Sequence, residues 1–329
     1  MDLRKEIQRN EVADEVQALT AVVIPILQGV VYALKDEAVF DAGGLAGLKL
    51  RQLPRVYRQG DGDCGICFEY AVHDAIASGH QLILDRIDTA LSAHCRIKGG
   101  DPSSILFGAE KTGAVQLIQT ARDTLTNDSR LLSGSKGQPV KLKKHIDAVA
   151  SAFRRRTERE NLPESISGLW KADLFVGRPE PDQWVGTTVK INPRHLEGAK
   201  GLRLAIVPSR QGKSDAIAKD ESRNLIVTPV PYDASFMEVF YQAWQVVQQF
   251  IAADAKVPKE VYLPRPADRQ VCRYLEDRRD YPVLDVIDAL RPLAQPHLLS
   301  TEEDSIDVSL RKGKGSITST IIAPMPCEE

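Results

Sequence analysis

The chain has few cysteines, almost no net charge and no long hydrophobic run. Its five cysteines are an odd, sparse set among 329 residues, which argues against a disulfide framework and favours a reducing compartment. The 43 lysines and arginines nearly balance the 45 acidic residues, for a formal charge of −2. Any contact with nucleic acid must therefore come from a local basic surface or from metal ions.

A membrane span and a secretory segment are not predicted. The most apolar stretch, residues 21–34, is shorter than the roughly 18 residues of a membrane span, and Gln28 and Gly29 interrupt it. The first six residues are mostly charged and lack the apolar region of a signal peptide. We therefore expect a cytoplasmic protein without a membrane partner.

The composition is that of a globular protein, with 43% hydrophobic and 27% charged residues. The length suits one large domain or two ordinary ones. Turn-rich stretches suggest an N-terminal helical region (1–60), a core (61–254) with a helical insertion at about 81–165, and a small C-terminal subdomain with a tail (255–329). Within the insertion, the apolar spacing predicts helices at 82–93 and 114–125. The order of helix, hairpin, two further strands and a long helix at 234–252 predicts an α/β fold.

The most informative stretch is residues 171–192. Two segments rich in Val, Ile, Phe, Trp and Thr are separated by Pro179, Pro181 and Asp182, which predicts an antiparallel hairpin. Asp173 lies early in the first segment and Lys190 late in the second, so the two residues are expected to be neighbours. A carboxylate beside a lysine on rigid strands suits a metal and a charged transition state.

A second stretch adds another acid. Residues 65–76 predict a helix that begins with Gly65-Ile-Cys-Phe-Glu69. A helix with Gly-x-x-Phe-Glu, a later strand with Asp, and a following strand that ends in x-x-Lys resemble the PD-(D/E)XK nuclease superfamily, most closely its Mrr-type and resolvase-type branches. The resemblance covers roughly residues 60–250, with a long insertion, and its motifs are short.

The resemblance implies a restriction-endonuclease-like core and Mg²⁺- or Mn²⁺-dependent cleavage of DNA, in a bacterial restriction or phage-defence setting. It implies that Asp173 is a metal ligand, that Lys190 is the lysine of the signature, and that Glu69 completes the metal site. The chain departs from the family at Thr188, where the pattern has an acid. Glu238 is a further candidate acid. A homodimer or a partner subunit is compatible with this class of nuclease.

A basic segment is a candidate contact for the phosphate backbone. Residues 141–156 predict a helix with an apolar face and basic residues at both ends. Those basic residues are Lys141, Lys143, Lys144, Arg154, Arg155 and Arg156. A solvated helix face explains them equally well.

Two other functions stay open at this stage. If no acid takes the place of the one missing at position 188, the core is a catalytically inactive nuclease-like subunit that binds or assembles. The Cys64-Gly-Ile-Cys67 motif instead suggests a cysteine-dependent hydrolase, because a thiol at a helix start has a lowered pKa. Such a hydrolase would need a histidine, and His94, His145 and His195 are candidates.

Overall fold

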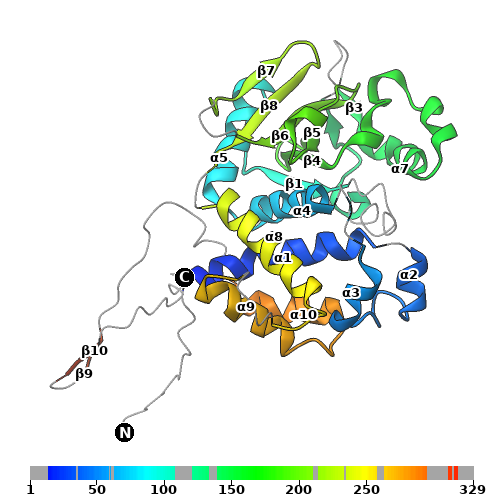
Figure 1. Cartoon of the computed structure of the whole chain (residues 1–329). Coiled ribbons are helices and arrows are strands. Elements are labelled where there is room, and N and C mark those ends of the chain that lie inside the picture. The colour runs from blue at the N-terminus through cyan, green and yellow to red at the C-terminus, as the bar shows by residue number, and fades with distance from the viewer. Residues whose placement is uncertain are drawn as a thin grey trace, which may run out of the picture.

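The protein is a mixed α/β structure with one large mixed sheet and helices on both of its faces (Figure 1). A computed structural model describes residues 14–34, 36–58, 60, 63–107, 121–132, 139–209, 214–232, 235–257, 263–294, 310–312 and 315–317. The α-helices in this part of the chain are α1 (Asp14–Tyr32), α2 (Asp36–Asp41), α3 (Leu53–Val56), α4 (Asp63–Ala77), α5 (Gln81–Thr89), α7 (Ile146–Arg154), α8 (Met237–Ala252), α9 (Pro266–Glu276) and α10 (Val283–Leu290).

Short helical turns connect many of these elements. A π-helical turn follows α5 at Ala90–His94. The 3-10 turns are Leu50–Gln52, Leu142–His145, Arg156–Asn161, Glu164–Ile166, Leu169–Lys171, Pro193–His195 and Arg291–Leu293.

The large sheet has eight strands. They are β1 (Ser103–Leu106), β2 (Arg130–Leu131), β3 (Val140–Lys141), β4 (Leu174–Arg178), β5 (Gln183–Val189), β6 (Leu202–Pro208), β7 (Ala218–Asp220) and β8 (Leu225–Val230). Their order is β1-β4-β5-β6-β8-β7, and β2 joins the side of β5 with β3 beyond it. β5, β6 and β8 are parallel, whereas β4 is antiparallel to both of its neighbours. A separate two-stranded sheet pairs β9 (Leu310–Lys312) with β10 (Gly315–Ile317).

The predicted hairpin is confirmed as β4 and β5, which pair antiparallel from Leu174↔Thr187 to Arg178↔Gln183. Its strands are shorter than the sequence suggested, because Lys171 lies in a 3-10 turn and Asp173 directly precedes β4. The turn is closed by Asp182, whose carboxylate accepts hydrogen bonds from the Trp184 indole and the Ser129 hydroxyl.

Alternate side chains of the hairpin pack into two apolar cores on opposite faces of the sheet, as the two-residue period of a strand requires. Leu174 and Val176 join the core that holds α1, α4 and α8. Phe175 and Trp184 join the core under α7, on the other face. The hairpin is thus buried on both faces, which leaves the ends of its strands for a site.

The predicted N-terminal helix is confirmed as α1, which continues through Pro25. It begins at Asp14, so it is longer than the apolar stretch considered above and is long and apolar enough to cross a membrane. In the structure, 72% of its most apolar window is buried, because α1 packs against α4, α8, α9 and α10. The expectation that no segment reaches this length was therefore wrong.

The insertion at 81–165 is not purely helical, contrary to expectation. It contributes α5 and α7, but also β1, which is paired with β4 in the main sheet, and the short pair β2–β3. Most of a helix predicted at 114–125 lies outside the described residues. The boundaries near 60 and 254 stay predictions, although a single apolar cluster runs from α1 through the sheet face to α10.

Candidate active site

Glu69, Asp173, Thr188 and Lys190 meet at one end of the β4–β5 hairpin. The Lys190 Nζ atom lies 2.9 Å from Asp173 Oδ2 and 3.3 Å from Glu69 Oε1. Glu69 belongs to α4, on a separate part of the chain. Two distant parts of the chain, α4 and the β4–β5 hairpin, therefore bring two carboxylates to one ammonium group.

The sheet fixes the backbone on both sides of this cluster. The Asp173 N–H donates to Thr187 O (2.9 Å), and the Lys190 N–H donates to Ile206 O (3.0 Å), so both residues extend the ladder beyond their strands. The register of β5 against β6 shifts between Gly186 and Thr187, just before the site. Irregularities of this kind re-aim the side chains that follow them.

Asp173 is the centre of the cluster. Its Oδ2 atom accepts hydrogen bonds from the Thr188 hydroxyl (3.0 Å), the Val189 N–H (2.7 Å) and the Lys190 ammonium (2.9 Å). Thr188 is 3% exposed, so its hydroxyl is fixed in this role. A threonine here orients the carboxylate, which an acid at the same position would repel.

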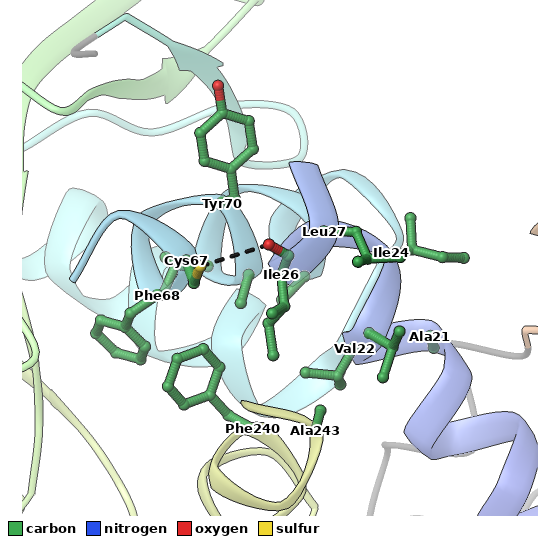
Figure 2. Close-up of a cluster of buried hydrophobic side chains, with 14 of the residues drawn as sticks. Ala21, Val22, Ile24, Ile26, Leu27, Cys67, Phe68, Tyr70, Phe240 and Ala243 are labelled. Carbon is green, nitrogen blue, oxygen red and sulfur yellow. Dashed lines mark hydrogen bonds between the residues drawn. The ribbon is translucent and has the colours of Figure 1, made fainter. Parts of the chain in front are cut away.

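Helix α4 brings Glu69 to the hairpin because its other side packs in the apolar core. Phe68 contacts Phe240 of α8 edge-on, with ring centroids 5.2 Å apart. The Cys67 thiol donates to Ile26 O of α1 at 3.4 Å, and these residues lie together in Figure 2. Glu69 is 9% exposed and Asp173 6%, so the two carboxyl groups lie at the margin of the core.

This burial changes the protonation of the cluster. Burial raises the pKa of Glu69 well above its usual 4.5, and the Asp173 charge and a hydrogen bond with Asp173 add to the rise, while Lys190 opposes it. Burial alone lowers the pKa of Lys190, but the charges of Asp173 and Glu69 outweigh it and leave the pKa raised. Without a further cation, the cluster therefore favours a protonated Glu69 and a charged Lys190.

The donor set fits Mg²⁺ or Mn²⁺ and does not fit a closed zinc site. The described residues contain no group of three or more His, Cys, Asp or Glu that could hold a metal. A structural zinc needs four protein ligands, whereas Mg²⁺ takes one or two carboxylates together with water and phosphate oxygens. Glu69 and Asp173 are the two residues that would hold it.

Other predicted site residues lie apart from the cluster. Glu238 is exposed in the first turn of α8. His73, four residues after Glu69 on α4, pairs with the Ser104 hydroxyl of β1 at 2.7 Å. One acid that the sequence did not suggest is Glu197, which is ion-paired to Lys171. The hydrogen bond and charge of Lys171 lower the pKa of Glu197, and the charge of Lys190 makes a smaller contribution. No motif around Glu197 in the sequence marks it as a site residue, because only the fold brings it within the electrostatic reach of Lys190.

The basic segment differs from its prediction. Only residues 146–154 form the α-helix, with a 3-10 turn before it. Lys141, Lys144, Arg155 and Arg156 are exposed, whereas the Lys143 ammonium donates to Leu125 O at 3.1 Å. The side chain of Arg154 lies outside the described residues. Among the described contacts, none joins this segment to Asp173, and its role in binding DNA stays a prediction.

The Cys64 and Cys67 thiols have the wrong electrostatics for a nucleophile. Burial raises the pKa of Cys64 to about 11, with a further rise from Asp63. Cys67 is fully buried, and burial likewise raises its pKa. An activated cysteine needs the opposite shift.

Comparison with protein-family models, with curated proteins and with solved structures gave no match. The arguments for function therefore depend on the geometry of this chain.

Proposed function

We propose that this chain is a metal-dependent nuclease that cleaves DNA phosphodiester bonds, with a divergent restriction-endonuclease-like core. The observation that carries the proposal is that Glu69, on α4, meets Asp173 and Lys190 of the β4–β5 hairpin, a part of the chain that is distant from it in sequence. All three residues were selected from the sequence by their resemblance to the PD-(D/E)XK pattern. A hairpin could bring an Asp and a Lys together by chance. Chance does not explain why an unrelated helix, α4, also supplies an acid at the same point.

The element order supports the same core. Within the proposed core, α4 with Glu69 precedes the antiparallel strands β1, β4 and β5, then β6 and β8 parallel to β5, and then α8. This includes the order of helix, hairpin, strands and helix that the resemblance implies. The elements α5, β2, β3, α7 and β7 are inserted between these core elements. The site lies where the strands end, which is where ligands bind in open α/β sheets.

Each residue of the cluster has a chemical role in such a reaction. Glu69 and Asp173 would hold Mg²⁺ or Mn²⁺, which when bound polarises a phosphoryl oxygen and lowers the pKa of bound water. The Lys190 ammonium places a positive charge where negative charge develops on the phosphate. Thr188 and the Val189 N–H keep the Asp173 carboxylate in one orientation.

Cleavage of linear and supercoiled DNA with Mg²⁺ or Mn²⁺ tests the proposal. We expect the native chain to cut, and Asp173→Ala and Lys190→Ala each to lose about 100-fold or more of the rate, as expected when a charge-stabilising group is removed. Lys219→Ala is a matched control, since Lys219 is an exposed residue of β7 that pairs only locally with Glu221. Cutting that survives both site substitutions would show that the site lies elsewhere.

A second candidate is a catalytically inactive nuclease-like subunit that binds DNA or a partner. The observation in its favour is that Asp173 Oδ2 already accepts three hydrogen bonds, one of them from the Lys190 ammonium, so the cluster is satisfied without a metal. This candidate predicts DNA or partner binding that is unchanged by EDTA, with no cleavage under any metal.

A further inference from the structure

A small cavity lies between α1, α4 and β1. Its volume is about 230 Å³. Its walls include Gln28 and Tyr32 from α1, Tyr70 and His73 from α4, and Ser104 and Leu106 from β1. Three elements of different sequence position thus contribute polar and aromatic groups to one half-open pocket.

One polar atom of the wall has no partner. Tyr70 is 5% exposed, and its hydroxyl is a buried polar group without a hydrogen-bond partner in the described structure. Figure 2 shows its side chain pointing away from Phe68, Phe240 and the rest of the apolar cluster. A buried hydroxyl without a partner is destabilising, so its retention favours a role in binding.

The other walls specify the kind of ligand. Tyr32 and Tyr70 stack with ring centroids 5.2 Å apart, and aromatic surfaces favour a flat ring. Gln28, Ser104 and Tyr70 offer hydrogen-bond donors and acceptors. His73 is neutral near pH 7 because burial lowers its pKa to about 4, and none of the described lining residues is acidic, lysine or arginine. The walls therefore suit an uncharged heteroaromatic ring with polar edges.

The cavity is next to the proposed catalytic residues. His73 follows Glu69 by four residues on α4, which is about one helical turn of 5.4 Å. Leu106 pairs with Leu174, the residue after Asp173, and the next N–H, that of Phe107, donates to Asp173 O at 2.9 Å. A nucleotide whose phosphate lay at the cluster would have its base within reach of the cavity.

We infer that this cavity binds one unpaired nucleobase of the DNA strand whose phosphate is presented to Asp173 and Lys190. The inference rests on the proposed nuclease function. The volume of the cavity is below the roughly 300 Å³ at which pockets for drug-sized ligands begin, so the cavity suits a single ring system. A base held in this cavity is unstacked from the DNA duplex, which costs free energy. Stacking on tyrosine and hydrogen bonds to the edge of the base offset that cost.

The test measures binding of the four deoxynucleosides to the full chain at millimolar concentration, by saturation-transfer NMR, without metal. We expect at least one to bind and Tyr70→Phe to weaken it by roughly 10-fold, the effect of one lost hydrogen bond. Tyr70→Phe should also raise the melting temperature slightly, because it removes an unpaired buried hydroxyl. Thr228→Val is the matched control, since the buried Thr228 hydroxyl likewise has no partner in the described structure but lies on β8. It should raise the melting temperature and leave binding unchanged.

Three outcomes would overturn the inference. They are that the native chain binds no deoxynucleoside, that Tyr70→Phe binds as well as the native chain, or that Tyr70→Phe lowers the melting temperature and thereby reveals a structural hydrogen bond. Because no cleavage is measured, these outcomes are separate from failure of the nuclease. A chain that cuts DNA but binds no nucleoside refutes only the base cavity, and a chain that binds a nucleoside but never cuts refutes only the nuclease.

Discussion

At the scale of single residues, the hydrogen bonds of the site converge on one atom, Asp173 Oδ2. It accepts hydrogen bonds from Thr188, Val189 and Lys190, and the same lysine reaches Glu69 at 3.3 Å. One ammonium group can neutralise only one of the two carboxylates, so a proton on Glu69 balances the remaining negative charge. Whatever replaces that proton should be a cation, which is the physical basis for expecting a metal here.

Glu69→Gln should make the protein more stable and inactive. Because the pKa of Glu69 is raised in the folded state, the folded chain keeps a proton that the unfolded chain loses above pH 4.5, and stability falls as the pH rises. Glutamine imitates the protonated carboxyl group and removes this loss. Thermal unfolding from about pH 5 to 8 should show a higher melting temperature for Glu69→Gln, with the largest gain at high pH.

The control for this substitution is Glu238→Gln, at an exposed acid on α8. It should change the melting temperature at pH 8 far less than Glu69→Gln does. A melting temperature of Glu69→Gln below that of the native chain at about pH 8 would mean that the charged form of Glu69 stabilises the fold.

Cleavage should not depend on the cysteines. The pKa of Cys64 is about 11 and that of the buried Cys67 is also raised, so neither thiol ionises near neutral pH. Cys64→Ala should cut DNA at the native rate, and EDTA rather than iodoacetamide should stop the reaction. Inhibition by iodoacetamide that Cys64→Ala removes would instead favour the cysteine-dependent hydrolase.

Among the elements, the contact between α1 and α4 holds Glu69 in place. A Cβ atom added at Gly29 would lie 2.8 Å from the Cys67 backbone, closer than real contacts allow. Gly29→Ala should therefore push the two helices apart and cost about 1–3 kcal/mol of stability, as overpacking does. Gly65→Ala, on α4 with nothing within 4 Å, should instead stabilise by about 0.5 kcal/mol.

Denaturant unfolding of both glycine variants measures this difference, and DNA cleavage by Gly29→Ala should fall as well. Equal stability of the two variants would show that α1 and α4 adjust without cost. Both glycines lie in helices, where alanine is intrinsically preferred to glycine, so the difference between the two variants reports the contact between α1 and α4.

Sequence patterns predicted the elements that carry the site better than those around it. Alternating β-branched and aromatic residues with prolines between them identified the β4–β5 hairpin, and the hairpin geometry then brought Asp173 to Lys190. The register shift at Gly186, the pairing of His73 with Ser104 and the place of β1 in the sheet were not predictable. Each depends on contacts between segments that are distant in the chain.

Over the whole molecule, the helices from both ends of the chain share a core with the sheet. Val271, Leu275, Ile287 and Leu290 of α9 and α10 are buried in the same cluster as α1 and α8. Figure 1 shows α9 and α10 on the side of α1 that faces away from the sheet. The sequence suggested a small C-terminal subdomain at 255–329, because prolines there separate short elements, and that boundary stays a prediction. Composition cannot show that such elements pack on a helix 250 residues earlier.

A chain that ends at residue 257 should not fold. Each buried aliphatic side chain of α9 and α10 contributes about 1.5–3 kcal/mol, and together they match the roughly 5–15 kcal/mol of a typical fold. Calorimetry should show one unfolding transition for the full chain and none for the truncated chain. A truncated chain that keeps a cooperative transition would establish residues 258–329 as an independent subdomain.

The most direct test of the central claim is calorimetry of Mn²⁺ binding, because it needs no knowledge of the DNA substrate. We predict one site on the native chain, with a proton released to the buffer as Glu69 ionises, and no binding by Asp173→Asn or Glu69→Gln. If the native chain binds no Mn²⁺, or if Asp173→Asn binds it equally well, then Glu69, Asp173 and Lys190 form a structural ion cluster and not a catalytic centre.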